Sequence, residues 1–430
     1  MRHVLPVAGA ALLLAGCSAP GGDPHAQTGP NPDLPPQNQY LMPPMHVAGI
    51  APWNGAKPSV AAGLRVAAFA GGFENVRSVY VLPNGDVLAV EPKGPSEPVA
   101  RPKDIVVNFV QGFGHSKVKG GNRITLLRDA DGDGRPELRT VFLDGLNAPF
   151  GVALVGGDLY VANTDAIVRY PYTPGQTRIT GPGTVLTELP GGPIDHHWTK
   201  SLVASPDGTK LYVGIGSNSN ITENGIEAEH ERARIWEVDR ATGAHRPFAT
   251  GLRNPNGLTF NPVTRQLWAV INERDELGPV LVPDYMTSVR DGAFYGWPYS
   301  YWGQHVDPRV RPQRPDLVAE AILPDYSLSS HVAPLGLAFG NASTLPAAYR
   351  QGAFVGEHGS WDRGHLNGYK VVYVPFAGGR PSGKAVDAIT GFIDPNGKAR
   401  GRPVALAVDN KGALLIADDV GNVVWRVTGG

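Results

Sequence analysis

Two adjacent histidines form the first group of residues in the sequence that could do chemistry. His196 and His197 lie in the phrase DHHWTK, directly before an expected strand. Neighbouring residues of an extended segment point to opposite sides, so we expect only one of the two imidazoles to face a given site. A neutral imidazole can act as a general base, and the alternative is a structural histidine held by hydrogen bonds.

A cation and an amide stand side by side in the phrase GLRNPNG, where Arg253 and Asn254 occupy a turn stiffened by proline and glycine. A fixed guanidinium is suited to holding a carboxylate or a developing oxyanion. The alternative is an arginine that only donates to backbone carbonyls of the turn. The pair therefore indicates an anion or cofactor site.

Acidic residues are dense in two phrases, and both indicate calcium. Glu273 and Asp275 belong to NERDE, which holds three carboxylates in four residues at the end of an expected strand. Such density is costly unless the carboxylates are solvated or bind a hard cation, and oxygen ligands favour calcium. Asp129, Asp131 and Asp133 alternate with small residues in DADGDG, as in a calcium loop. A helical EF-hand would need Glu eleven residues after Asp129, where this sequence has Thr. Two interpretations of the phrase remain, a structural calcium loop and a solvated acidic hairpin.

Four further polar or aromatic residues lie in comparable turns. They are Tyr295 in FYGWP, His331 in HVAP, Arg363 in GSWDRG and Arg402 in GRPV. Cations, imidazoles and aromatic surfaces spread over many loops can serve one site only if the fold brings those loops together.

A repeated phrase identifies the elements that would position these residues. Each copy has Asn, Asp, Gly or a similar turn residue followed by alternating apolar residues, which is typical of a hairpin. Six copies predict an all-β fold, a six-bladed β-propeller, with a pair of β-sandwiches as the alternative. The copies are PNGDVLAV from Pro83, GGDLYVAN from Gly156, PDGTKLYVGIG from Pro206, PVTRQLWAVIN from Pro262, YRQGAFVGEHG from Tyr349 and DNKGALLIADD from Asp409.

The N-terminal segment has the features of a bacterial lipoprotein. Residues 1–17 combine a short apolar run with Leu-Ala-Gly-Cys, and Cys17, the sole cysteine, is the expected lipid acceptor after cleavage. An ordinary secretory signal is the alternative. Residues 18–45 are rich in Pro, Gly, Asn and Asp and predict a flexible tether. The propeller is then expected over residues 46–430, lipid-anchored at a membrane on the periplasmic side of the cell envelope, with the outer membrane favoured by Ser18.

Composition excludes several classes of function. A net charge of −1 gives no footprint for nucleic acid. No glycine-rich phosphate loop follows a strand and opens a helix, which argues against a nicotinamide or ATP enzyme. The counts of 55 Gly and 40 Pro are typical of a turn-rich β protein.

From about Leu64 to Val427, the chain resembles the PQQ-dependent sugar dehydrogenases of the soluble glucose dehydrogenase fold, where PQQ is pyrroloquinoline quinone. Within that family it is similar to the membrane-associated L-sorbosone dehydrogenase branch. The phrases that carry the resemblance are NRITLLRDADGDG, HHWTK, GLRNPNG, NERDELG, FYGWP, HVAPLGLAFG, GSWDRG and GRPVALAVDNKGALLIADD.

The resemblance implies roles for individual residues. His197 matches the general base, and Arg253 lies near the reacting quinone carbonyl with Asn254 beside it. Cofactor contacts are implied for Tyr295, His331, Arg363, Arg402 and, in place of a glutamine, Asn147. Calcium ligands are implied at Glu273, Asp275 and Tyr285. His196 stands where glucose-oxidising relatives have Asp, and Asp362 stands where they have the cofactor lysine.

The sequence as a whole predicts a PQQ- and calcium-dependent dehydrogenase. Its substrate would be a sugar or a sugar-derived aldehyde of the sorbosone or aldose type, and its electrons would pass to an acceptor of the envelope respiratory chain. Two alternatives remain open at this point. One is a calcium-dependent lactonase propeller, and the other is a non-catalytic propeller that binds a surface partner.

Overall fold

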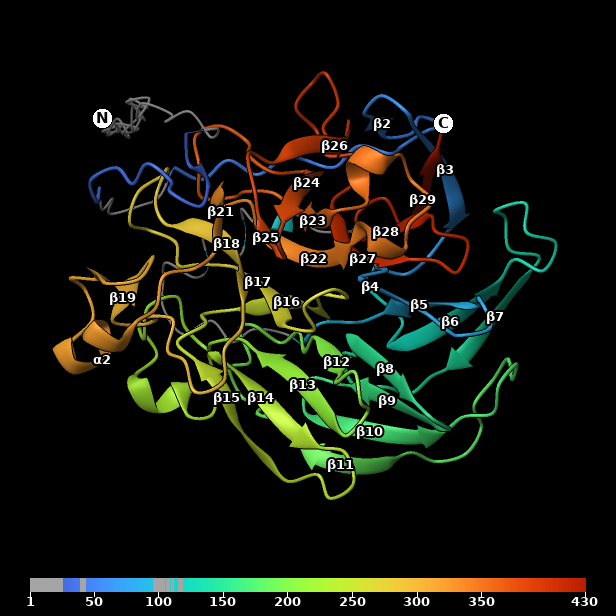
Figure 1. The fold of residues 1–430 in the computed structure, drawn as a ribbon, viewed down its shortest axis with the longest axis horizontal. Coiled ribbons are helices and arrows are strands. Elements are labelled where there is room, and N and C mark those ends of the chain that lie inside the picture. The colour runs from blue at the N-terminus through green and yellow to red at the C-terminus, as the bar shows by residue number, and fades with distance from the viewer. Residues whose placement is uncertain (1–25, 39–43, 96–104, 106–108, 110–111, 115–118) are drawn as a thin grey trace, which may run out of the picture.

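Six antiparallel sheets surround a central axis in the computed structural model, as Figure 1 shows. The structure describes residues 26–38, 44–95, 105, 109, 112–114 and 119–430. The prediction of an all-β, six-bladed propeller is therefore confirmed. The predicted signal peptide and Cys17 lie outside the described residues.

Each blade contains four strands that follow one another outward from the axis. Blade 1 has β4 (Ser78–Val81), β5 (Val87–Glu91), β6 (Arg123–Arg128) and β7 (Leu138–Leu143). Blade 2 has β8 (Gly151–Val155), β9 (Asp158–Ala162), β10 (Ala166–Pro171) and β11 (Thr184–Glu188). Blade 3 has β12 (Leu202–Ala204), β13 (Lys210–Ile215), β14 (Arg234–Asp239) and β15 (His245–Thr250).

The other three blades include strands from the N-terminal part of the chain. Blade 4 has β16 (Pro255–Phe260), β17 (Leu267–Ile271), β18 (Pro283–Ser288) and β21 (Tyr326–Ser330), with β1 (Thr28–Gly29) at its edge. Blade 5 has β22 (Pro334–Phe339), β23 (Gly352–Glu357), β24 (Lys370–Ala377) and β26 (Val386–Thr390), with β2 (Ser59–Val60) at its edge and β25 (Arg380–Pro381) beside β24. Blade 6 has β27 (Pro403–Val408), β28 (Leu414–Asp418), β29 (Val423–Gly429) and β3 (Leu64–Gly71).

The six repeated phrases of the sequence coincide with the hairpins that join the first and second strands of the blades. Each second strand is almost wholly buried; β17 and β28, for example, are buried at every residue. The turn residues and the apolar run were thus sufficient to locate all six blades.

The ring closes because β3 from the N-terminal side pairs with β29 from the C-terminal end. Their antiparallel register runs from Leu64 opposite Gly429 to Gly71 opposite Val423. Buried hydrophobic clusters fill the spaces between neighbouring blades, as in the cluster shared by blades 5 and 6 that contains Trp425 and Phe354. The apolar faces of adjacent sheets therefore supply the packing that holds the ring together.

Part of the predicted tether lies against the propeller instead of being free. Thr28 and Gly29 pair with Leu328 and Ser327 of blade 4. The Gln27 side chain is 3% exposed, and its oxygen accepts hydrogen bonds from serine hydroxyls of that blade. The outer strand of blade 4 presents unpaired backbone groups, which an extended segment satisfies by adding a strand. The tether prediction is thus corrected for residues 26–38.

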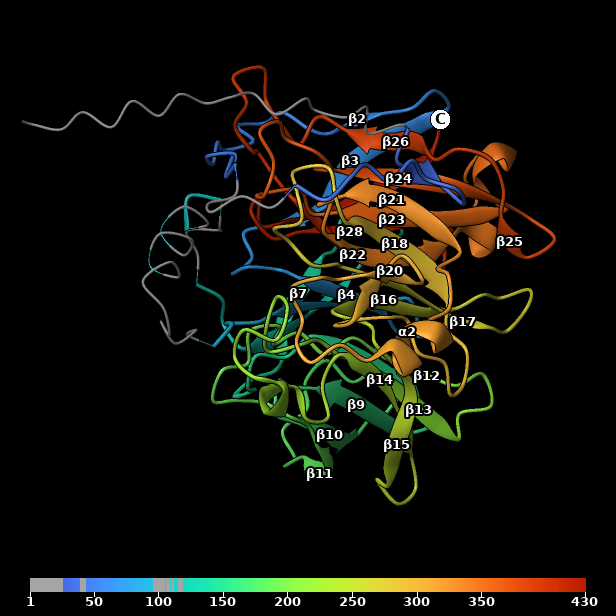
Figure 2. The ribbon, with the colours of Figure 1, turned by 90° about the vertical axis from the view of Figure 1, so that its left-hand side faces the viewer.

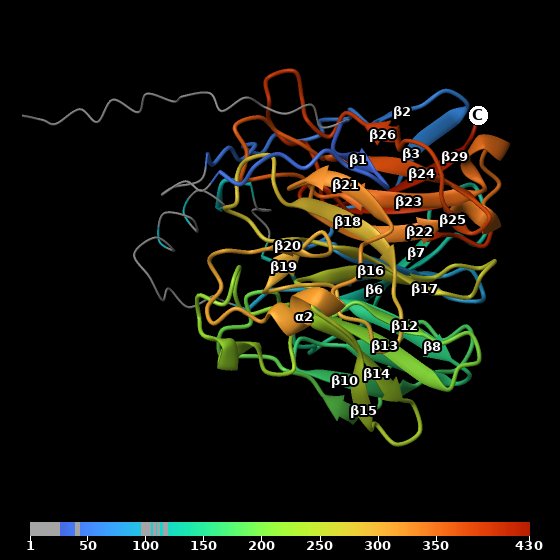
Figure 3. The ribbon, with the colours of Figure 1, turned by 60° about the vertical axis from the view of Figure 1, so that its left-hand side comes forward.

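Helical segments are short and peripheral. Between β18 and β21 the chain forms β19 (Ser300–Tyr301), β20 (His305–Val306) and α2 (Pro315–Glu320), and 3₁₀ turns cover Ile226–Glu229, Gly340–Ala342 and Ala347–Tyr349. Figures 2 and 3 show α2 on the outside of the blades. No helix among the described residues combines the length and apolar character needed to cross a membrane.

Candidate active site

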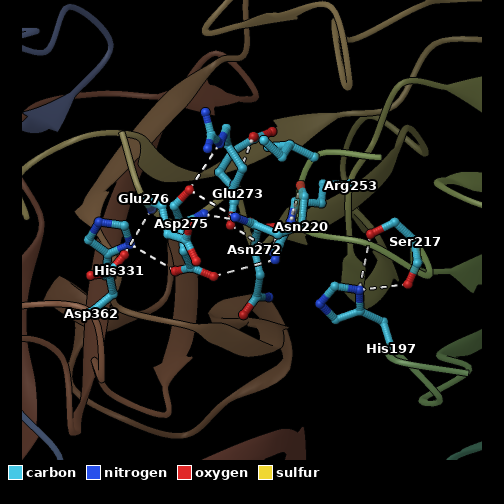
Figure 4. A network of polar contacts seen from close by, with 12 residues as sticks. His197, Ser217, Asn220, Arg253, Asn272, Glu273, Asp275, Glu276, His331 and Asp362 are labelled. Atoms are coloured by element: carbon cyan, nitrogen blue, oxygen red, sulfur yellow. Dashed lines mark hydrogen bonds and ion pairs between the residues drawn. The ribbon is translucent and has the colours of Figure 1, made fainter. Parts of the chain in front are cut away.

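Most of the predicted site residues lie in loops at one end of the propeller. In an antiparallel blade, the loop after the second strand and the loop leading to the next blade open at the same end. His197, Arg253, Glu273 and His331 occupy such loops. Figure 4 shows that side chains from several of them form one polar network. The fold thus brings together residues that are far apart in the sequence.

His197 lies in a turn before β12 and is half-buried. Its Nδ1 is 2.8 Å from the Ser217 carbonyl oxygen and 3.1 Å from the Ser217 hydroxyl. Because a carbonyl only accepts, Nδ1 carries the proton and Nε2 keeps a lone pair. Burial, and then the nearby His196 and Arg253, hold the pKa of His197 well below its ordinary value. A neutral imidazole with a basic Nε2 is the form that a general base requires.

The two histidine rings do not project to opposite sides, so that prediction is wrong. Their centroids are 4.5 Å apart in an edge-to-face contact. The segment is a turn rather than a strand, and Asp195 before it has a positive φ of 46°. The alternation rule holds only for extended backbone, which explains the failure.

A buried charged group supports the turn that carries His197, and sequence reasoning missed it. Asp195 lies 2.9 Å from the Arg232 guanidinium and 3.4 Å from the Lys200 ammonium. Arg232 also donates to the His197 carbonyl, at 3.3 Å. Burial lowers the pKa of Lys200 to about 7. Asp195 and Lys200 flank the histidines in the sequence, but nothing there indicated Arg232, which comes from the next blade.

Arg253 is 4% exposed and joins two loops. Its Nη1 donates to the Glu273 carbonyl at 2.7 Å, and its Nη2 lies 3.4 Å from the Asp275 carboxylate. Asn220, a further residue that the sequence did not indicate, accepts the Asp275 N–H at 2.8 Å and donates to the Asp275 carbonyl at 3.0 Å. These contacts fix the guanidinium at the centre of the network in Figure 4.

Asn254, next to Arg253, has a buried amide oxygen with no hydrogen-bond partner in the structure. The neighbouring Gly216 leaves no room for a side chain. A Cβ at position 216 would lie 2.4 Å from the His197 Cβ and 2.5 Å from the Asn254 Oδ1. His197 and Asn254 therefore approach each other closely across a glycine, and a buried acceptor without a partner needs a donor that a ligand could supply.

The predicted calcium ligands are not brought together as one set. The Asp275 carboxylate contacts Arg253 and His331. Among the charges that act on Glu273, that of Arg253 has the largest effect, followed by that of Asp284. Burial raises the pKa of Glu273 to about 7 and that of Tyr285 well above its ordinary value. The assignment of Glu273, Asp275 and Tyr285 as calcium ligands stays a prediction.

Asp275 instead belongs to a buried group with His331 and Asp362. His331 Nδ1 is 3.2 Å from Asp275, and its Nε2 is 3.0 Å from the Gly278 carbonyl. Burial by itself would lower the pKa of His331, but the hydrogen bond to Asp275 and the charge of Asp362 raise it to about 9. Burial raises the pKa of Asp362 to about 7.

Two other arginines predicted to bind a cofactor, Arg363 and Arg402, make hydrogen bonds within the protein. Arg402 donates to the carbonyls of His358, Gly114 and Gly359 at 2.7, 3.2 and 2.8 Å. Arg363 donates to the Ser330 hydroxyl at 2.8 Å. Their guanidinium groups hold loops in place, which is the alternative role for an arginine in a turn.

His358 and Asp419 form a buried pair that sequence reasoning missed. The His358 Nε2 is 3.0 Å from both carboxylate oxygens of Asp419, and Arg77 lies 3.3 Å from the same carboxylate. Burial and the charge of Arg402 lower the pKa of His358 to about 3. His358 and Asp419 each stand near the end of a repeated phrase, directly after β23 and β28. This shared position is the signal from which the sequence could have identified them.

The structure places the residues of three other predictions outside this network. The Tyr295 hydroxyl donates to the Ser288 carbonyl at 2.7 Å within the apolar cluster between blades 3 and 4. Asn147 is exposed and donates to Asp165 at 2.8 Å. The acidic turn of Asp129, Asp131, Asp133 and Glu137 does bring four carboxylates within 4.8 Å of one another, but it joins β6 to β7 at the opposite end of the propeller.

A family model described as TrAA12-like matches residues 119–282 and 317–429, which include both the His197 and the Arg253 loops. The chain belongs to the TrAA12-like family. It is 26% identical over 292 residues to an uncharacterised protein of Borreliella burgdorferi, covering 66% of this chain and 76% of that protein. It is also 25% identical over 205 residues to an aldose sugar dehydrogenase of Escherichia coli, covering 42% of this chain and half (50%) of that enzyme.

Solved structures place this TrAA12-like chain in the same fold as known quinoproteins. The holo form of the pyranose dehydrogenase PQQ domain from Coprinopsis cinerea superposes with a TM-score of 0.69 and is 20% identical. The match covers 89% of this chain and 99% of that one. The likeness agrees with the propeller derived from the repeated phrases.

Proposed function

We propose that this protein is a PQQ-dependent dehydrogenase that oxidises a sugar or a sugar-derived aldehyde, such as an aldose or sorbosone. The observation that carries the proposal is the half-buried His197, whose Cβ approaches Asn254 across Gly216 and whose pKa is lowered by burial, His196 and the fixed guanidinium of Arg253. The sugar dehydrogenase activity of the Escherichia coli relative and the PQQ domain of the Coprinopsis structure support it.

The residues present fit PQQ in part. Arg253 offers a cation for a group that is rich in carboxylates and carbonyls, and Asn254 has an acceptor that no protein atom satisfies. When bound, PQQ supplies a quinone that accepts a hydride from the substrate carbon. Arg253 would stabilise negative charge beside it. Arg363 and Arg402 contribute through the loops that they hold.

His197 would remove the hydroxyl proton of the substrate or of a hydrated aldehyde. The Ser217 carbonyl fixes the proton on Nδ1, so Nε2 is the atom that accepts the substrate proton. The charged group of Asp195, Lys200 and Arg232 holds the backbone of the turn. No step of this reaction is assigned to calcium.

The test is reconstitution of the purified protein with PQQ, followed by turnover of aldoses, sorbosone and simple alcohols with an artificial electron acceptor. We expect substrate-dependent reduction of the acceptor that needs PQQ and is not replaced by NAD or NADP. Hydrolysis of lactones without PQQ would support the lactonase alternative. Absence of both activities would support a propeller that only binds a partner.

We propose that Cys17 carries the lipid anchor and that electrons pass to an acceptor in the cell envelope. The lipoprotein motif at Cys17 supports this localisation. Metabolic labelling with a palmitate analogue, followed by separation of inner and outer membranes, tests it. A protein that is unlabelled and lies in the soluble fraction would contradict it.

A further inference from the structure

Three side chains that can bind a metal converge from three loops of blades 4 and 5. Asp275 follows β17, His331 follows β21 and Asp362 follows β23. One ligand atom of each lies within 4.8 Å of the others. Figure 4 shows the three side chains grouped on the side of the network away from His197.

The state of Asp362 points to a missing partner in this group. Asp362 is 1% exposed, and its Oδ2 accepts the Glu276 N–H at 2.9 Å, but its Oδ1 has no hydrogen-bond partner. Leaving a carboxylate oxygen unpaired in a buried place is expensive, and native proteins rarely do so. A cation within the group would satisfy it.

The orientation of His331 is that of a metal ligand. Its Nε2 faces the Gly278 carbonyl at 3.0 Å, and because the carbonyl can only accept, Nε2 carries the proton. Nδ1 lies 3.2 Å from the Asp275 carboxylate oxygen, where it donates a proton when the ring is charged and directs a lone pair when the ring is neutral. Two lone pairs at that distance repel unless a cation or a proton lies between them. Metal-binding histidines commonly donate their second N–H to a backbone carbonyl in this way.

We propose that Asp275, His331 and Asp362 bind a divalent transition-metal ion. One imidazole nitrogen with two carboxylates suits ions such as Zn²⁺ or Mn²⁺, whereas calcium prefers a shell of oxygens. Bonds of about 2.0–2.2 Å at tetrahedral angles separate ligand atoms by roughly 3.2–3.6 Å. The 3.2 Å between His331 and Asp275 fits this spacing. Three protein ligands leave a fourth position open.

The ion would neutralise two carboxylates that are buried side by side and would tie the loops of blades 4 and 5 together. Asp275 also contacts Arg253 through its other oxygen, at 3.4 Å, so the ion would be linked to the centre of the network. This metal site does not depend on the proposed dehydrogenase activity, because binding can be measured without PQQ or sugar.

The experiment is a titration of the full chain, prepared without a histidine tag and freed of metal by chelation. Zn²⁺ is added against a chromophoric chelator, and Co²⁺ is added to record the absorption of its d–d bands. We expect one equivalent of Zn²⁺ to bind and Co²⁺ to show the intense bands of a site with few ligands. Ca²⁺ should not displace either ion.

Three variants locate the site. Asp362→Asn keeps the size of the side chain and should weaken Zn²⁺ binding by more than roughly 100-fold, beyond the loss typical of an outer-shell change. His331→Gln should do the same and abolish the Co²⁺ bands. Asp129→Asn, the matched change in the acidic turn at the opposite end, should leave the affinity unchanged. Circular dichroism and melting temperature show whether each variant is folded.

Two results would overturn the proposal. One is a folded wild-type protein that binds no Zn²⁺ or Co²⁺, which would mean that a proton on His331 satisfies the carboxylates. The other is binding that survives Asp362→Asn and His331→Gln but is lost in Asp129→Asn, which would place the ion at the acidic turn.

Discussion

Replacement of His197 by Ala should remove the general base while leaving the fold intact. The ring makes its polar contacts to Ser217, whose carbonyl also accepts the His197 backbone N–H at 3.3 Å. Loss of one hydrogen bond costs about 1 kcal/mol, so the variant should stay folded. Loss of general-base catalysis lowers turnover by roughly 10²- to 10⁴-fold, or about 2.7–5.4 kcal/mol of transition-state stabilisation. The PQQ affinity should change far less.

The pH profile gives an independent measure of the same base. Only the neutral imidazole accepts a proton, and burial together with His196 and Arg253 lowers the pKa of His197. Activity of the wild type should therefore be retained below pH 6.5 and fall only as the pH drops through the lowered pKa. Arg253→Gln removes a positive charge that lowers the pKa of His197. The acid limb of the pH–activity profile should therefore move to higher pH in this variant, whatever its absolute rate.

The assay compares His197→Ala with His196→Ala in turnover, PQQ titration and melting temperature. His196→Ala loses the ring contact with His197 but should keep most of its turnover. The assignment would be refuted if His196→Ala were inactive and His197→Ala nearly normal. It would also be refuted by an acid limb that stays in place in Arg253→Gln.

Three more predictions concern the fold and the anchor. Gly336→Ala places a Cβ 2.1 Å from the Val404 carbonyl oxygen, where blades 5 and 6 meet at the axis, and should lower stability by at least about 1–3 kcal/mol in thermal unfolding. Gly49→Ala, which meets nothing within 4 Å, is its control and should melt like the wild type. Burial raises the pKa of Glu357 from 4.5 to about 8, so the folded state keeps a proton that the unfolded state releases. The free energy of unfolding should therefore fall as the pH rises from about 4.5 to about 8. Glu357→Gln should flatten that dependence between pH 5 and 9; an unchanged slope in chemical denaturation would argue against a buried neutral carboxyl. Cys17→Ser should yield a protein without lipid, since a hydroxyl does not replace the thiol as acceptor, and a variant that mass spectrometry shows still acylated would contradict this.

The repeated phrases were enough to predict the architecture, because a hairpin turn followed by an apolar strand is a local pattern. Six copies gave six blades, and blade connectivity then placed His197, Arg253, Asp275 and His331 at one end of the ring. These results need no knowledge of contacts between distant residues, since strand order and direction decide at which end a loop emerges.

Side-chain partners were decided by the tertiary structure alone. Nothing in the sequence indicated that Asp275 faces His331 and Asp362 rather than Glu273, because the three come from different loops. Tyr295 was also unpredictable, since an aromatic phenol serves equally well in a site or in an apolar core.

The N-terminal segment shows the same division. Its composition is that of a tether, and residues 26–38 nevertheless lie against blade 4 because Thr28 and Gly29 pair with an exposed strand edge. Local sequence patterns were enough to predict the blades, the end at which the polar loops gather and the kinds of chemistry available there. The tertiary structure decided which of those side chains meet, because closure of the ring brings together loops that are separated by tens to hundreds of residues in the chain.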